Sequence, residues 1–248
     1  MYPANDDTKM TTQMITYYRI SDNSYVKPRF GDKRRCLENF LTVFSPPPGE
    51  LVIVADRCGE PTVEMIRDVC KSTSVDLPDS CLHRTDIGHG AGSWRYTAQL
   101  ALQKPDNQPI YFLEDDYLHL PGSKALILEG LAIAPYSTLY DHPDKYVPRE
   151  QGGNPFVQNG GESTRLLRTA SSHWKLTNST TMTFATTTGV LRNDLNIWDV
   201  HTRGSHPNDF AAFIDLYRKG RTLVVSIPGR STHCDSQWPT PGVDWESV

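Results

Sequence analysis

The chain has 248 residues, of which 38% are hydrophobic, and a formal net charge of −4 at pH 7. That size and composition allow one sizeable core, as a single domain or two small lobes, while the lack of a basic excess argues against nucleic-acid binding. No apolar run approaches a membrane span, no signal-peptide pattern is present, and the five cysteines have no CxxC spacing. We therefore expect a soluble, cytoplasmic protein with reduced thiols and no membrane span.

The first half of the chain alternates predicted strands and helices. Residues 1–12 are polar and aperiodic, so we expect a loose N-terminal tail there. The predicted strands are 14–20, 51–55, a short one within 75–83, and 109–114. Asp32 is the expected cap of a first helix, which turns Leu37, Phe40, Leu41 and Phe44 inward. Pro61 opens a second predicted helix, with Val63, Ile66 and Cys70 inward. A third is predicted at 94–103, after the glycine-rich loop 88–93. Strands that alternate with helices in this way indicate a mostly parallel sheet.

The fourth predicted strand ends abruptly in three consecutive carboxylates, Glu114, Asp115 and Asp116. Neighbouring carboxylates repel by roughly 4 kcal/mol at an effective dielectric near 20, so a cation, an extra proton or solvent must relieve them. Ligands of open α/β sheets bind outside the carboxyl ends of the strands. Acids at that point favour a hard divalent cation completed by phosphates, although a solvated acidic turn is the alternative.

In the second half, loops and β-like segments replace the regular alternation. We expect a helix at 123–134, a long mobile loop at 141–163, strands at 164–176 and 178–186, a short helix at 188–198 and a last buried strand at 223–227. An amphipathic helix begins within 205–209 and places Phe210, Phe213, Ile214 and Tyr217 on one face. The irregular tail from Pro228 carries His233, Trp238 and Trp245, which predicts that it packs back on the body.

Four placed features together resemble the nucleotide-sugar glycosyltransferases of the GT-A fold. They are Arg19 in the polar end of the first strand, Asp56 at the end of the second, the Glu114-Asp115-Asp116 triplet as a DxD-like motif, and His233 after the last strand. The resemblance implies a Rossmann-like α/β fold whose mostly parallel central sheet is flanked by helices, with a mixed β acceptor half. It further implies a single domain over 13–248, with residues 13–120 binding the nucleotide donor and 121–248 forming the acceptor half and C-terminal tail.

The same resemblance suggests roles for individual residues. Asp116 and His233 would ligate Mn²⁺ or Mg²⁺, and Glu114 or Asp115 would contact the ribose or sugar of a UDP- or GDP-sugar donor. Asp56 would lie beside the nucleotide base. Arg19 and Arg95 suit charge-assisted hydrogen bonds to phosphate.

Asp209, at a helix start, resembles the general base of inverting family members, which would deprotonate a glycan or another hydroxyl acceptor. Members often have Glu-Asp there, whereas this chain has Asn208-Asp209, so Asp235 is kept as an alternative base. His173-Trp174 could stack on a sugar face or pack in the core. Two alternatives to a metal-dependent glycosyltransferase stay open: a nucleotidyltransferase on a related sheet, and a non-catalytic nucleotide- or carbohydrate-binding module.

Overall fold

The computed structural model describes residues 13–22, 28–157, 161–234 and 237–248. The predicted tail, residues 1–12, and the alternative base Asp235 lie outside the described residues, as does part of the polar loop that follows the first strand.

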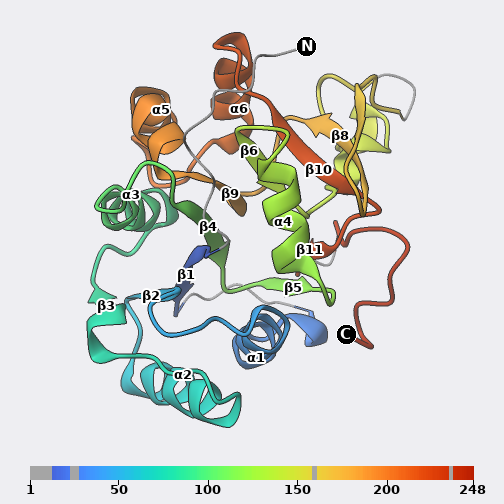
Figure 1. The fold of residues 1–248 in the computed structure, drawn as a ribbon. Helices are drawn as coiled ribbons and strands as arrows, with labels where there is room; N and C mark the ends of the chain where they lie inside the picture. Colours follow the sequence, from blue (N-terminus) through green and yellow to red (C-terminus); the bar gives the residue numbers. More distant parts are fainter. Residues whose placement is uncertain (1–12, 23–27, 158–160, 235–236) are drawn as a thin grey trace.

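One large sheet forms the centre of the molecule (Figure 1). Its strands are β1 (Ile15–Ser21), β2 (Leu51–Asp56), β3 (Leu82–Thr85), β4 (Pro109–Glu114), β6 (Tyr136–Thr138), β7 (Leu166–Arg168), β8 (His173–Thr177), β9 (Phe184–Thr187) and β10 (Leu223–Ile227). They lie in the order β3-β2-β1-β4-β9-β6-β10-β8-β7. The strands β3, β2, β1 and β4 are parallel, as is the pair β6–β10.

The sheet as a whole is mixed, so the expectation of a mostly parallel central sheet is wrong. The expected mixed β character of the second half agrees with its strands, which pair in both directions. The pairs β4–β9, β6–β9, β8–β10 and β7–β8 are antiparallel. Antiparallel neighbours can be joined by short turns, whereas parallel neighbours need a crossover, usually a helix. Of these four pairs, β7–β8 is joined by a short turn, whereas the other three pair strands that are far apart in the chain.

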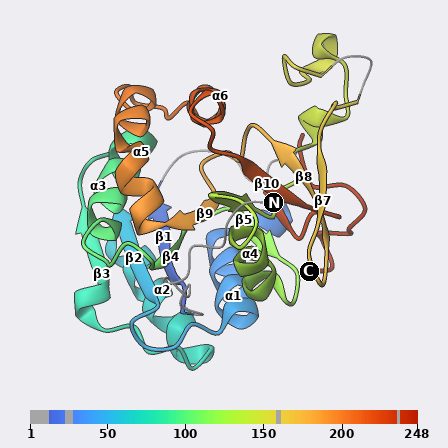
Figure 2. The ribbon, with the colours of Figure 1, turned by 45° about the horizontal axis from the view of Figure 1, so that its top comes forward.

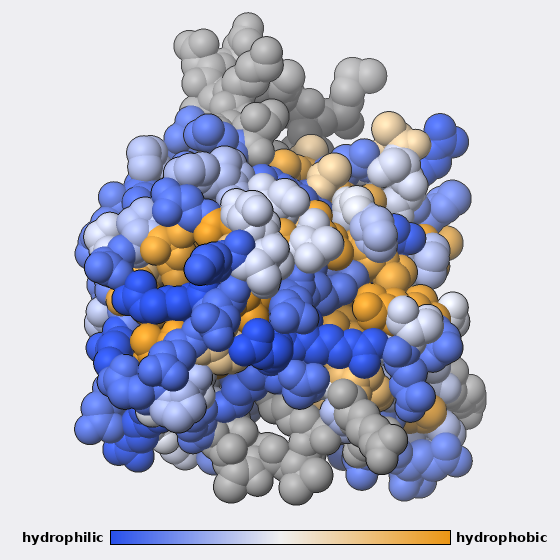
Figure 3. Space-filling view, turned by 90° about the horizontal axis from the view of Figure 1, so that it is seen from below, coloured by the Kyte–Doolittle hydropathy of each residue, from blue (hydrophilic) through white to orange (hydrophobic). Residues whose placement is uncertain are grey.

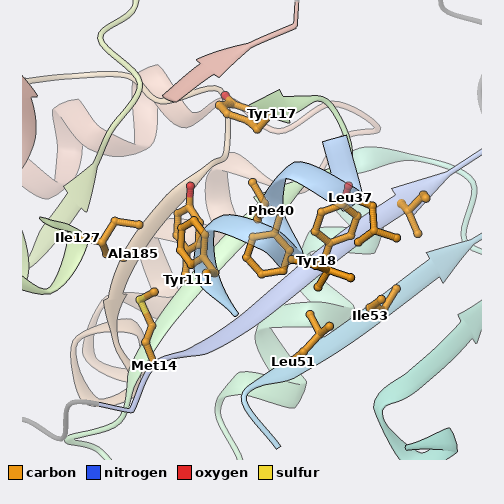
Figure 4. Close-up of a cluster of buried hydrophobic side chains, with 14 of the residues drawn as sticks. Met14, Tyr18, Leu37, Phe40, Leu51, Ile53, Tyr111, Tyr117, Ile127 and Ala185 are labelled. Carbon is orange, nitrogen blue, oxygen red and sulfur yellow. The ribbon is translucent and has the colours of Figure 1, made fainter. Parts of the chain in front are cut away.

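Helices cover both faces of the sheet (Figure 2). They are α1 (Lys33–Phe44), α2 (Glu60–Ser72), α3 (Gly90–Ala101), α4 (Ser123–Leu131), α5 (Thr188–His201) and α6 (Asp209–Arg218). The helices α1, α2 and α4 share one apolar core with the sheet, and α3, α5 and α6 share the other. Alternation along β1 separates the two cores, since Tyr18 packs on Phe40 of α1 while its neighbour Tyr17 packs on Phe112 and lies in the second core. Figure 4 shows the first core.

The start of α1 was predicted correctly from its sequence, whereas the start of α3 was not. Asp32 caps α1 as predicted, because its side chain accepts a hydrogen bond from the Arg35 amide at 3.0 Å. Helix α3 begins at Gly90, earlier than the predicted Trp94, because the His89 ring accepts a hydrogen bond from the Gly92 amide at 3.0 Å and acts as the N-cap. A histidine cap is uncommon, and the glycines resemble a loop in sequence.

The second half departs from expectation in several elements. The predicted loop at 141–163 contains two 3₁₀ turns, Pro143–Lys145 and Arg149–Gln151, and buries Lys145 and Asn154. The predicted strand 164–176 is two strands, β7 and β8. Of the predicted strand 178–186, only residues 184–186 lie in the sheet, as part of β9. In α6 the buried residues are Ala212, Phe213 and Leu216, whereas Tyr217 is exposed.

The C-terminal tail packs back on the body, as predicted. Its strand β11 (Ser231–His233) pairs antiparallel with β5 (Tyr117–His119), a strand that periodicity did not predict. Trp245 is buried beside Leu118, Cys36 and Cys234. The tail is therefore anchored directly after the acidic triplet.

The surface shown in Figure 3 is mainly hydrophilic, with separate apolar areas. Among the described residues, no helix combines the length and apolar character needed to cross a membrane.

Candidate active site

Three strands of the parallel group end at the same edge of the sheet. Their register pairs Ser21 with Asp56 and Arg19 with Glu114, so the carboxyl ends of β1, β2 and β4 lie side by side. From β1 the chain goes outward through β2 and β3 and then returns to the other side of β1 as β4. The loops after β1 and β4 therefore diverge, and this is the topological switch point where open α/β sheets bind ligands.

Arg19 and Glu114 form an ion pair at the switch point, with 2.8 Å between the guanidinium and the Glu114 carboxylate. Arg19 is buried and also donates to the Gly90 carbonyl at 3.2 Å. Burial raises the pKa of Glu114 to about 7. The charge of Arg19 lowers this pKa and the Asp116 carboxylate raises it, but burial has the largest effect. Near neutral pH, Glu114 is thus partly protonated, which is one of the ways expected to relieve three adjacent acids.

Asp115 and Asp116 point to different partners. The Asp115 carboxylate is buried and accepts a hydrogen bond from the Ser21 amide at 3.2 Å, which ties the ends of β1 and β4 together. The Asp116 carboxylate lies 3.2 Å from Nε2 of His233. The backbone carbonyl of Asp116 accepts a hydrogen bond from the Cys234 amide at 2.7 Å. The small sheet of β5 and β11 thus brings the predicted metal-ligand pair, Asp116 and His233, together.

The surroundings of His233 are strongly negative. Burial alone would lower its pKa, but the Asp116 carboxylate and then Glu114 outweigh burial and raise the pKa of His233 to about 9. The imidazole is therefore protonated at neutral pH and donates to Asp116. The raised pKa shows that Asp116 and Glu114 stabilise a positive charge at this position.

Asp56 lies at the predicted strand end, where its carboxylate closes the loop between β3 and α3. It accepts from the Thr85 hydroxyl at 2.9 Å and from the Ile87 and Gly88 amides at 2.7 Å and 2.9 Å. These bonds give Asp56 a structural role. A carboxylate has about four acceptor sites, so contact with a base is compatible with them and stays a prediction.

Arg95 is directed elsewhere. Its guanidinium donates to the Thr202 carbonyl after α5, and the described part of the chain shows no hydrogen bond or ion pair from it to the acidic triplet. A phosphate contact would require this bond to break. Trp174 is fully buried, and its indole N–H donates to the Thr169 hydroxyl at 2.9 Å. The tryptophan therefore packs in the core, which was the alternative to stacking on a sugar.

Asp209 is the first residue of α6, and its carboxylate accepts a hydrogen bond from the Thr180 amide at 2.7 Å. Asn208 provides the cap itself, because its side chain accepts from the Ala211 amide at 3.0 Å. Asp209 is therefore not needed as the helix cap. The carbonyl of Thr180 accepts from the Tyr117 hydroxyl at 3.0 Å, which connects Asp209 to the residue that follows the acidic triplet.

Two residues at this edge were missed in the sequence. Asp22 accepts from Lys33 at 2.7 Å, from the Gly59 amide at 2.9 Å and from the Thr62 hydroxyl at 2.7 Å, so it joins the end of β1 to the starts of α1 and α2. Tyr117, which follows the acidic triplet, is the second of these residues. An acid directly after a strand, as at Asp56, was the signal that could have identified Asp22.

Comparison with known proteins places the fold. No family model and no curated protein matches the chain. A crystal structure of GalNAc-T7 with UDP, GalNAc and Mn²⁺ is similar at 12% sequence identity and a TM-score of 0.55, covering 88% of this chain and 43% of that one. Residues 1–349 of TarS from S. aureus match at 13% identity and a TM-score of 0.44, covering 85% of this chain and 57% of that one, a score too low to carry an argument.

The chain thus spans less than half of the GalNAc-T7 chain. The likeness confirms the GT-A fold that the placed residues resemble.

Proposed function

We propose that this protein is a metal-dependent glycosyltransferase that moves a sugar from a nucleotide-sugar donor to a hydroxyl acceptor with inversion. The observation that carries the proposal is the convergence of Glu114, Asp116 and His233 at the switch point of a GT-A fold. Residues 13–120 would hold the donor and residues 121–248 the acceptor. GalNAc-T7, which shares the fold, was crystallised with UDP, GalNAc and Mn²⁺, which supports a UDP-sugar as the first donor to test.

The residues present fit a divalent cation. Asp116 offers a carboxylate oxygen and His233 an imidazole nitrogen 3.2 Å apart. A cation bound between them would displace the proton that the imidazole holds in its absence. Within the described ranges, no group of three or more His, Cys, Asp or Glu side chains is placed to hold a metal. A cation held by these two residues would therefore be completed by water and the donor's diphosphate, as is usual for Mg²⁺, and the chemistry it supplies is neutralisation of the leaving diphosphate.

Asp209 would act on the acceptor. One of its carboxylate oxygens accepts a hydrogen bond from the Thr180 amide. The other oxygen would take the proton of the attacking hydroxyl. That hydroxyl oxygen forms the new bond to the anomeric carbon as the bond to the diphosphate breaks, so the configuration inverts. A positioned general base contributes roughly 10²–10⁴-fold to the rate.

Donor turnover tests this proposal against its alternatives. The protein is incubated with UDP- and GDP-sugars, with Mn²⁺ or with EDTA, and the products are separated. Metal-dependent release of UDP or GDP, with the freed sugar inverted, supports the transferase. A parallel incubation with UTP or GTP and a sugar 1-phosphate tests the first alternative, because a nucleotidyltransferase would join them to an NDP-sugar and release pyrophosphate. Saturable binding without turnover in either incubation would indicate a binding module.

A further inference from the structure

A short turn, Thr180–Thr183, connects the acidic triplet to Asp209. At one end, the Thr180 amide donates to the Asp209 carboxylate at 2.7 Å. At the other, the Thr183 hydroxyl accepts from the Glu114 amide at 3.4 Å, and the Thr183 carbonyl accepts from the Thr138 hydroxyl at 3.0 Å. A displacement of this turn would move Asp209 relative to the end of β4.

The backbone of the turn is in a costly conformation. Thr181 has φ 46° and Met182 has φ 61°, although neither residue is glycine. A non-glycine residue in the left-handed region is strained and persists only where its surroundings fix it. Thr180, Met182 and Thr183 are buried, so packing and the hydrogen bonds above hold the turn in place.

Tyr117 contacts the first two residues of the turn. Its hydroxyl donates to the Thr180 carbonyl at 3.0 Å and also contacts the Thr181 hydroxyl. Its ring is buried against Tyr140 and His233, with centroid distances of 5.7 Å and 5.3 Å. The two peptide groups of Thr180 thus connect Tyr117, next to the acidic triplet, with Asp209 on α6.

We propose that Tyr117 is a positioning residue, which through the Thr180–Thr183 turn fixes the Asp209 carboxylate relative to the donor site. The inference rests on the proposed function. In this role Tyr117 does not contact the substrate and acts only by fixing the position of the Asp209 carboxylate. Tyr117 would therefore affect the rate of turnover rather than the binding of the donor.

A hydroxyl deletion with a matched control separates positioning from general stability. Tyr117→Phe keeps the ring and its contacts but removes the bond to Thr180. Tyr111→Phe is the control, because the buried Tyr111 hydroxyl makes a hydrogen bond of 2.8 Å to His119 in the core, away from Asp209. Each variant loses one buried hydroxyl, which has two partners in Tyr117, Thr180 and Thr181, and one in Tyr111. A merely structural role for Tyr117 predicts a loss of stability in both variants and no selective loss of turnover.

The first readout is metal-dependent hydrolysis of a UDP-sugar, with water as the acceptor. Loss of one hydrogen bond corresponds to a decrease in kcat of up to about tenfold. We expect this decrease in Tyr117→Phe, with donor KM and Kd unchanged, and parental values in Tyr111→Phe. Parental kcat in Tyr117→Phe, or equal losses in both variants, would overturn the inference while leaving the proposed function intact.

The second readout is hydrogen exchange of the peptide that contains residues 180–183, which needs no activity. Exchange should be faster in Tyr117→Phe than in the parent and in Tyr111→Phe, because the turn opens more often. Equal exchange in the two variants would overturn the inference. If the parent hydrolyses no donor, the proposed function fails, and the exchange result still decides whether Tyr117 fixes the turn.

Discussion

Acidification should destabilise this protein through His119, a buried histidine of β5. Its ring is fully buried, packs edge-on against Phe44 at 5.0 Å, and makes a hydrogen bond of 2.8 Å to the Tyr111 hydroxyl. Burial lowers the pKa of His119 to about 3 from its usual value of 6.5. Below pH 6.5 the unfolded chain therefore binds a proton here that the folded chain does not, and stability is lost as the pH falls.

The size of the effect follows from the pKa difference. Each pH unit below 6.5 costs about 1.4 kcal/mol of unfolding free energy, so His119 should cost about 2 kcal/mol between about pH 7.5 and about pH 5. Above pH 6.5 the histidine is neutral in both states and its contribution is constant. Most carboxylates stay ionised across this window.

Urea unfolding of the parent and of a double variant, His119→Phe with Tyr111→Phe, measures this contribution. The double variant removes both partners of the hydrogen bond, which leaves no buried polar group unpaired. The difference in unfolding free energy between the two proteins should change by about 2 kcal/mol over the window, in favour of the variant at low pH. A difference that is independent of pH would show that His119 is not held neutral by burial.

Three further outcomes are expected. Asp116→Asn should weaken Mn²⁺-dependent binding of UDP at least about tenfold, and it should also lower the unfolding free energy, because it removes the carboxylate that pairs with the protonated His233; calorimetry with equal affinity in both proteins would remove Asp116 as a ligand. Asp209→Asn should lower kcat by about 10²-fold or more with donor affinity retained, whereas parental turnover would leave Asp209 a structural acid. Trp245→Ala should lower the unfolding free energy by about 3–5 kcal/mol, because Trp245 is 3% exposed and leaves a cavity beside Leu118; a loss below about 1 kcal/mol would mean that the tail packs loosely.

The sequence predicted the parts of the site that depend on local signals. An apolar run that stops at Glu114 predicts a buried strand ending in acids, and Asp32 before an apolar periodicity predicts a helix start. Because parallel strands end at a common edge, the positions of Asp56 and Glu114 in the chain were enough to place both at that edge.

Contacts between distant segments could not be predicted from periodicity. The strands β5 and β11 are too short to show a period, yet their pairing brings His233 to Asp116. The direction of a long side chain is also set by its tertiary partners, and Arg95 therefore binds the Thr202 carbonyl, not the switch point. His233 was placed near Asp116 only by resemblance to a family.

Metal-dependent binding of a nucleoside diphosphate tests the central claim most directly. Titration of UDP and GDP into the protein by calorimetry, once with Mn²⁺ and once with EDTA, requires no acceptor and no knowledge of the sugar. We expect saturable binding of at least one of them with Mn²⁺ and a loss of at least about tenfold in EDTA, because in the proposed site Asp116 and His233 would provide only two of the ligands and the diphosphate would complete it. Absence of binding to both, or equal affinity with and without the metal, would contradict this claim.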